Sequence, residues 1–517
     1  MKRILTLLLC AALLVGLSGC GMDNKEPYVP TGSGLTWDEE DYTGPTAQTD
    51  ALEKVQSMSL TYYPTESMNP ILCTDFTNRA LFSLLYQGLF SVNREYQVEP
   101  ILCRKYRRSE DMKTYTFYLE NATFSDGSRL TAQDVVDTLL AAKESTYYGG
   151  RFLHISEIAL SEDGGVTVQM DTACENLPVL LDIPILKRTQ LDAQYPIGTG
   201  PYVLEDNVTN LRLRRLSDWW CTAEMSVTAP AISLIPAESP TQIRDEFEFS
   251  DLSLVCADPG SDNYADFRSD FELWDCENGI FLYLAFNLDS EVFSNPQLRS
   301  AVTYAINREA IVQEHYRGFA RSAVLPMSPL SPYYSQKLAD AYSYDSVRFA
   351  QALNEAALLQ EEPVVFLVNS DDSLRVRVAR TIRDMLEDCG LKVVMKEQTG
   401  RDYRYSLLIR TYDLYLGQTK LSANMDLTPF FSNSGTLSYG RMSDVSTYSL
   451  CLEALANHGN YFTLHQKIME NGLICPILFR SYSIYATRGL LSDLTPSRDN
   501  IFYYSLGKTM EGAAISN

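Results

Sequence analysis

The chain has 517 residues, of which 45% are hydrophobic, and a formal net charge of −23. This length predicts two to four domains, and the hydrophobic content is typical of a globular protein. The negative charge excludes a nucleic-acid-binding function, because such binding depends on neutralising phosphates with Lys and Arg. It also argues against direct attraction to anionic lipid surfaces.

The first 19 residues have the three parts of a secretory signal peptide. Lys2 and Arg3 give a positive start, residues 4–17 are almost all apolar, and small residues lead into Cys20. The apolar run is shorter than the ~20 residues that a transmembrane helix needs. The ending Leu-Ser-Gly-Cys is similar to the bacterial lipobox, whose cysteine is acylated. We therefore expect Cys20 to anchor the chain by lipid on the extracytoplasmic face of the cell membrane; the alternative is an ordinary cleaved signal.

Residues 20–50 are expected to form a flexible acidic tether. They are rich in Gly, Thr, Pro, Asp and Glu and show no apolar periodicity, so they cannot build a packed core. A tether of about 30 residues has a reach on the order of 30 Å. That reach is enough to hold a globular body clear of the lipid headgroups.

Beyond the tether, strands and amphipathic helices alternate in a pattern that predicts the mixed α/β class. The expected strands cover 59–63 and 114–119, and the expected helices cover 76–90, Thr131–Ala142 and a segment that begins at Pro296. Residues 364–396 read as a strand, a helix that stops at Gly390 and a second, parallel strand.

Residue types that carry chemistry are sparse. The nine cysteines from Cys73 to Cys475 include no Cys-x-x-Cys pair, and an odd number cannot all pair within one chain. The sequence has only four histidines, at positions 154, 315, 458 and 465, and lacks His-Glu-x-x-His, Gly-x-Ser-x-Gly and P-loop motifs. The sequence therefore predicts no catalytic residue, no metal site and no cofactor.

Several segments resemble, in order and spacing, one family of proteins. They are residues 69–70, 85–90, 100–102, 109–119, 124–127, 130–136, 198–202, 286–287 and 298–311. The stretch from 109 to 136 looks like the signature D-G-x-T-Y-T-F-x-L … F-S-D-G-x-x-L-T-A-x-D-V. The chain thus resembles the family 5 (peptide, oligopeptide and nickel type) extracellular solute-binding proteins of ABC transporters. We expect these segments to serve as scaffold, with 299–311 forming one amphipathic helix.

The resemblance implies an α/β, two-lobed periplasmic-binding-protein-like fold of type II with an extra subdomain and a hinge between the lobes. Lobe I would comprise residues 51–68, 195–283 and 470–517, with 69–194 inserted as the subdomain. Lobe II would comprise residues 284–469. Ligand binding would then close the two lobes by hinge motion.

The resemblance also points to one wall of a ligand cleft, in residues 417–426. Peptide-binding relatives hold the ligand amine with an aspartate that follows a Gly-Trp pair. Here Gly417 is followed by Gln418, and the aspartate position holds Leu421, which cannot pair with an ammonium group. Gln418 and Lys420 would suit a carboxylate or polar ligand, although Lys420 could equally be solvated. Asp426 either anchors the ligand or caps the helix that follows.

The opposite wall would come from the loop after the first strand, which contains Glu66, Ser67 and Asn69. These three residues could equally be turn residues. The expected function is a non-enzymatic, monomeric solute-binding lipoprotein that delivers a peptide or similar small solute to the transmembrane subunits of an ABC importer. One alternative is a peptide-sensing lipoprotein on the same fold. The other is a secreted hydrolase, against which the absence of catalytic motifs argues.

Overall fold

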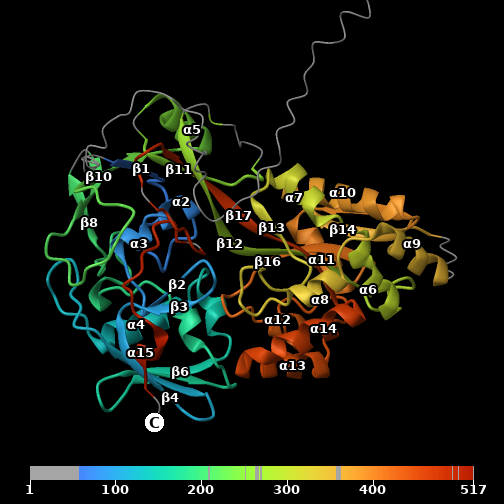
Figure 1. Cartoon of the computed structure of the whole chain (residues 1–517), viewed down its shortest axis with the longest axis horizontal. Helices are drawn as coiled ribbons and strands as arrows, with labels where there is room; N and C mark the ends of the chain where they lie inside the picture. Colours follow the sequence, from blue (N-terminus) through green and yellow to red (C-terminus); the bar gives the residue numbers. More distant parts are fainter. Residues whose placement is uncertain are drawn as a thin grey trace, which may run out of the picture.

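The computed structural model describes residues 58–207, 210–250, 252–261, 267, 270–356, 362–491, 493–498 and 500–515. The expected signal peptide, Cys20 and the tether lie outside these residues. Two bodies lie side by side in Figure 1: a first lobe (58–270 and 488–515) and a second lobe (287–473).

Two long strands, β12 (Phe271–Phe286) and β17 (Ile474–Thr487), run antiparallel through both lobes. In the first lobe β17 pairs with β11 (Leu254–Ala257), and in the second lobe β12 pairs with β16 (Leu414–Lys420). The sheet has the order β11-β17-β12-β16-β14-β15, with β13 on β17. Most residues of the two long strands are buried and many are aromatic or aliphatic, which explains their strand conformation.

Two further sheets build the first lobe. One has the order β1-β10-β9-β8 and the other β18-β4-β5-β7-β6, and helix α4 packs on β6 and β7. The strands and helices of this lobe are β1 (Met58–Tyr62), α2 (Phe76–Arg79), α3 (Phe82–Leu85), β2 (Phe90–Val92), β3 (Val98–Pro100), β4 (Cys103–Arg108), β5 (Thr114–Leu119), α4 (Ala132–Lys143), β6 (Ile155–Leu160), β7 (Val166–Met170), β8 (Tyr202–Asn207), β9 (Asn210–Arg215), β10 (Ala231–Pro236), α5 (Pro240–Phe249), α15 (Met510–Ala513) and β18 (Ala514–Ile515).

Helices cover the second lobe's part of the long sheet. Helices α10 and α11 pack on β14 and β15, and α6 packs against α9 and α14. The elements of this lobe are α6 (Pro296–Ala305), α7 (Arg308–Tyr316), β13 (Ala320–Ser322), α8 (Gln336–Ala341), α9 (Ser346–Glu355), β14 (Val364–Asn369), α10 (Ser373–Asp388), β15 (Val393–Gln398), α11 (Gly400–Ile409), α12 (Thr428–Phe431), α13 (Val445–Ala456) and α14 (Tyr461–Asn471). No helix in the described ranges is long and apolar enough to cross a membrane.

Elements with strong local signals form as the sequence predicts. Thr131 caps α4, and its side chain and that of Asp134 form a reciprocal capping box. The segment 364–396 is a parallel βαβ unit, and Gly390 ends its helix region with φ of 100°. The strands expected near 59–63 and 114–119 are confirmed as β1 and β5.

Two helix predictions were wrong because tertiary contacts interrupt the helices. The segment 76–90 forms only the short helices α2 and α3, since Tyr86 turns to an extended conformation where the Leu85 carbonyl accepts a hydrogen bond from Gly200 N at 3.0 Å. The segment 299–311 is split into α6 and α7. Ile306 is extended, and the Asn307 side chain caps α7 by accepting from Ala310 N.

Arg308 shows how the segment 298–311 serves the scaffold. Its guanidinium is buried and donates to the carbonyl oxygens of Pro476 at 2.8 Å and Ala323 at 3.1 Å, so it joins α7 to β17 and to the chain after β13. Burial lowers the pKa of this guanidinium. Carbonyl dipoles thus hold the charge in place.

We predict that Arg308→Met lowers the free energy of unfolding by about 2–4 kcal/mol, because several buried carbonyls lose their donor. Urea unfolding followed by circular dichroism measures the change. The matched control is Arg380→Met, since Arg380 is half exposed and pairs with Glu397 at the surface; we expect a change of less than about 1 kcal/mol there. Equal stabilities of the two variants would contradict this role for Arg308.

Candidate functional site

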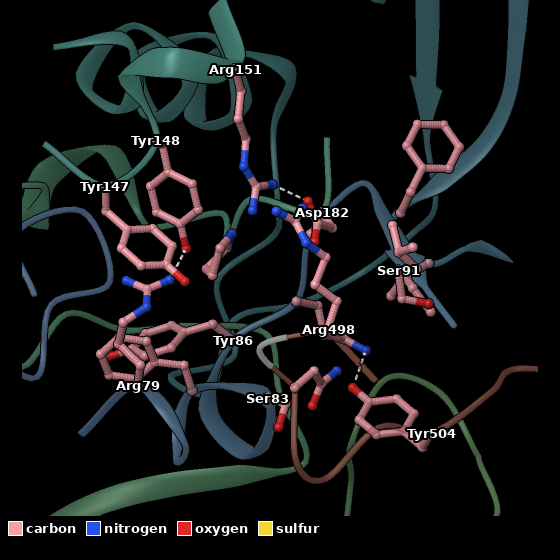
Figure 2. Close-up of a pocket in the computed structure, with 18 residues that line it drawn as sticks. Arg79, Ser83, Tyr86, Ser91, Tyr147, Tyr148, Arg151, Asp182, Arg498 and Tyr504 are labelled. Carbon is pink, nitrogen blue, oxygen red and sulfur yellow. Dashed lines mark hydrogen bonds and ion pairs between the residues drawn. The ribbon is translucent and has the colours of Figure 1, made fainter. Parts of the chain in front are cut away.

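A pocket of about 90 Å³ lies in the first lobe where it faces the second (Figure 2). This volume has room for a few water molecules or for one end group of a solute. Five separate segments build it: α2 to β2, Ile101 after β3, the turn after α4, the chain near Asp182 and the C-terminal segment 498–504. The lining residues are Arg79, Phe82, Ser83, Tyr86, Gln87, Gly88, Phe90, Ser91, Val92, Ile101, Tyr147, Tyr148, Arg151, Asp182, Pro184, Arg498, Asn500 and Tyr504.

The second lobe contacts this pocket through the end of β16. Lys420 Nζ donates to the Tyr147 hydroxyl at 2.9 Å, and the Lys420 ammonium lies 4.7 Å from the centre of the Tyr147 ring. Arg498 Nη2 donates to the carbonyl oxygen of Leu421, the residue after β16. The pocket therefore lies at the seam between the lobes and is contacted by both.

The pocket is cationic although the protein is acidic. Its charged lining residues are Arg79, Arg151, Arg498 and Asp182, three positive and one negative. Arg151 and Asp182 form an ion pair, which leaves an excess of two positive charges. The side chains of the three arginines enter the pocket from different elements (Figure 2). This arrangement favours an anionic or strongly hydrogen-bond-accepting group.

Aromatic rings hold Arg79 in place. Its Cζ lies 3.3 Å from the centre of the Tyr147 ring, and its Nη2 donates to the Tyr148 hydroxyl at 2.6 Å. Nη1 donates to the Cys73 carbonyl at 2.9 Å. Stacking and hydrogen bonds together fix the orientation of this guanidinium before any ligand arrives.

A second pocket of about 300 Å³ lies on the other side of α2. Arg79 at the end of α2 lines the first pocket, whereas Phe76 at its start lines the second and stacks on Tyr482 of β17 with ring centres 3.6 Å apart. Arg480 lies nearby and joins the lobes, donating to Asp258 at 2.6 Å and to Gln418 at 3.3 Å. Helix α2 thus separates two openings along one seam.

The residues expected to form a loop of the cleft belong to strand β16, which corrects that part of the prediction. Gly417 pairs with Tyr283, and a side chain at 417 would collide with the Tyr283 ring. Gln418 contacts Arg480, and Lys420 reaches Tyr147. Regular pairing with β12 extends the strand through Lys420, so the chain leaves the sheet only after that residue.

Asp426 makes a local turn contact and a contact between lobes. Its Oδ1 accepts a hydrogen bond from Thr428 N at 2.8 Å, but the N-cap residue of α12 is Leu427, and no side chain caps that helix. Its Oδ2 lies 3.1 Å from His154 Nε2, on the first lobe. The side chain is buried and does not line the pocket with the three arginines.

Glu66, Ser67 and Asn69 make turn contacts. Asn69 is fully buried and donates to the carbonyls of Leu191 and Ala193 at 2.7 and 2.9 Å, and the Ser67 hydroxyl accepts from Asn69 N. Glu66 is exposed. None of these three lines either pocket described above.

The arginines of the pocket were missed by the sequence analysis. Arg79, Arg151 and Arg498 stand alone in the sequence, far from one another, and belong to none of the motif segments. No spacing rule links them, because only the fold brings α2, the turn after α4 and the C-terminal segment together.

The described residues contain no group of three or more His, Cys, Asp or Glu side chains that could hold a metal ion. Nine cysteines in the described ranges are unpaired, and most are buried, as small apolar side chains would be.

His154 lies at the seam between the lobes, where its imidazole contacts three side chains. Besides Asp426, its Nδ1 lies 3.5 Å from Asp171 Oδ1, and the Thr428 hydroxyl lies 3.1 Å from its Nε2. Burial disfavours the charged imidazole, but the hydrogen bonds and charges of Asp426 and Asp171 outweigh it and raise the pKa of His154 above 6.5.

The long strands shared by two α/β lobes, with a pocket at the seam, define a type II periplasmic-binding-protein fold. The family of bacterial extracellular solute-binding proteins, family 5 (middle region), matches residues 97–439. The chain belongs to this family, and the resemblance seen in the sequence is confirmed.

Individual relatives are distant. The glutathione-binding protein GsiB of Escherichia coli (strain K12) is 24% identical over 342 residues, which cover 63% of this chain and 66% of the relative; the match thus spans just under two thirds of that relative. Two solved structures share the fold. The ABC transporter substrate-binding protein CtaP from Listeria monocytogenes has a TM-score of 0.70 at 17% identity, covering 86% of this chain and 97% of that chain. The unliganded open form of the periplasmic murein tripeptide-binding protein MppA has a TM-score of 0.71 at 14% identity, covering 88% and 98%.

The raised pKa of His154 predicts how the contribution of this residue to folding stability depends on pH. The folded state binds the proton more tightly, so this stabilisation is complete below the unfolded pKa of about 6.5 and is lost as pH rises through the folded value. We expect His154→Gln to lower the melting temperature clearly at a pH of about 5.5 and much less at about 8.5. Differential scanning calorimetry at both values tests this, and a difference that does not change with pH would contradict it.

Proposed function

We propose that this protein is an extracytoplasmic solute-binding lipoprotein that captures a peptide or similar small solute between its lobes and delivers it to an ABC importer. The observation that carries the proposal is the pocket at the seam, where side chains of the first lobe meet Lys420 and Leu421 of the second. The lining side chains all belong to the first lobe, and the second lobe contacts two of them through Lys420 and Leu421. A solute in the pocket would therefore favour the arrangement in which the two lobes touch.

The relatives support a peptide-like solute. GsiB is named for binding glutathione and MppA for binding a murein tripeptide, and both ligands are short peptides with free carboxylates. The sequence expectation places 51–68, 195–283 and 470–517 in lobe I, 69–194 inserted in it, and 284–469 in lobe II. In the fold, β12 and β17 lie between the two bodies 58–270 with 488–515 and 287–473. These two strands would therefore be the hinge, because they pair with strands of both bodies.

Lipid on Cys20 would keep the protein at the membrane, where its importer lies. We predict that cells grown with labelled palmitate incorporate the label into the wild-type protein, and that Cys20→Ser abolishes it and releases the protein from the membrane fraction. Two lipid signals give stable anchoring, whereas an unmodified acidic body has no affinity for anionic headgroups. Full labelling of Cys20→Ser would contradict the anchor.

Lys420 is expected to stabilise the closed state through Tyr147. Because the contact joins exposed groups across the lobes, we predict that Lys420→Ala raises the Kd for the native solute two- to fivefold, which corresponds to about 0.4–1 kcal/mol. Calorimetric titration with the solute eluted from the wild-type protein measures this change.

The matched control for this test is Lys396→Ala. Lys396 is half-buried and donates to Thr411 within the second lobe, so its removal leaves the seam unchanged. If both variants lose the same affinity, or if Lys420→Ala loses none, Lys420 has no role in solute binding.

A further inference from the structure

Arg498 is the least neutralised charge in the pocket. Its side chain is only 8% exposed. Nη2 donates to the Leu421 carbonyl, whereas Nε has no partner among the residues that the structure describes. In the same ranges no carboxylate forms an ion pair with Arg498, while Asp182 is engaged by Arg151. A buried guanidinium without a direct ion pair is costly, so the fold must gain something by keeping it.

The backbone is shaped to admit this guanidinium. Strand β12 departs from regular pairing with β17 between Glu277 and Phe281, and Gly279 within this bulge has φ of 70°. A Cβ atom at position 279 would lie 2.5 Å from both Nε and Nη2 of Arg498. Only glycine combines this positive φ with the space that Arg498 occupies.

The nearest buried acid, Glu277, interacts with Arg498 through its charge but forms no direct ion pair with it in the described residues. Glu277 accepts hydrogen bonds from the Tyr96 hydroxyl and, at 2.9 Å, from the Ser328 hydroxyl, and its Oε2 lies 3.9 Å from Arg321 Nε. Burial raises the pKa of Glu277 in spite of these hydrogen bonds and of the two arginine charges. The direct contacts of its carboxyl oxygens are therefore made with Tyr96, Ser328 and Arg321.

Three further side-chain oxygens of the same pocket lack hydrogen-bond partners within the described residues. The Ser83 and Ser91 hydroxyls, which can donate, and Asn500 Oδ1, which can only accept, are all buried. Together with Arg498 Nε they offer three donors and one acceptor. A carboxylate next to an N–H or O–H group matches this set.

We propose that Arg498 determines specificity for a solute whose buried end is a carboxylate flanked by a hydrogen-bond donor. This inference rests on the proposed solute-binding function and names the chemistry of the end that enters the pocket. The carboxylate takes hydrogen bonds from Arg498 and Ser83, and the neighbouring donor binds Asn500. The pocket volume of about 90 Å³ has room for such an end group.

The first test uses the full chain in mild detergent, exposed to yeast extract, washed and denatured, with the released solute identified by mass spectrometry. The wild type is compared with Arg498→Gln, Arg498→Lys and the control Arg212→Gln, whose arginine pairs with Glu205 at the surface. We expect the wild type and Arg212→Gln to retain the same carboxylate-bearing solute. Arg498→Gln should retain at most a tenth as much, and Arg498→Lys an intermediate amount.

The second test needs no variant. The released solute and its carboxamide are titrated against the wild type, and the amide should bind at least about tenfold more weakly. This comparison decides the matter even if Arg498→Gln fails to fold. Equal binding of the acid and the amide overturns the proposal, as does undiminished retention by a folded Arg498→Gln.

The outcomes separate this inference from the proposed function. A captured solute without any carboxylate leaves solute binding intact and overturns the role of Arg498. A wild-type protein that retains no solute from yeast extract overturns both.

Discussion

The pairing of β12 with β17 is the constraint on which the rest of the structure depends. These two strands alone span both lobes within the described chain, and β11 and β16 extend the sheet from them into each lobe. Between the two halves, the pairing is interrupted at residues 278–280. A regular ladder would join the lobes rigidly, whereas an interruption lets each half move with its own lobe.

The same interruption lies against Arg498, which lines the pocket. The carbonyl of Gly279 accepts a hydrogen bond from Leu421 N at 3.1 Å, and the carbonyl of Leu421 accepts one from Arg498. The bulge of β12, the end of β16 and the C-terminal segment are thus joined through one backbone residue.

The sequence predicts those parts of the fold whose signals are local. Three such features form as expected: the helix cap at Thr131, the helix stop at Gly390, and the strand–helix–strand order of residues 364–396. Their signals come from residues that are close together in the sequence. The breaks at Tyr86 and Ile306 could not be foreseen, because each depends on hydrogen bonds or packing that are made only in the folded chain.

The candidate site was predicted only in outline. The family resemblance pointed to residues 417–426 as one wall of the ligand cleft. Of these residues, Lys420 donates a hydrogen bond to Tyr147, which lines the pocket. The arginines were not foreseen, since Arg79 and Arg498 are separated by most of the chain and are brought to one pocket only when the first lobe folds. Charge clusters assembled from isolated residues leave no spacing pattern in the sequence.

The most direct measurement is small-angle X-ray scattering of the purified protein before and after saturation with the solute eluted from it. Closure of two lobes about β12 and β17 predicts a smaller radius of gyration and a shorter maximum dimension on binding. An unchanged scattering profile at full occupancy, with binding confirmed calorimetrically on the same sample, would contradict capture by lobe closure.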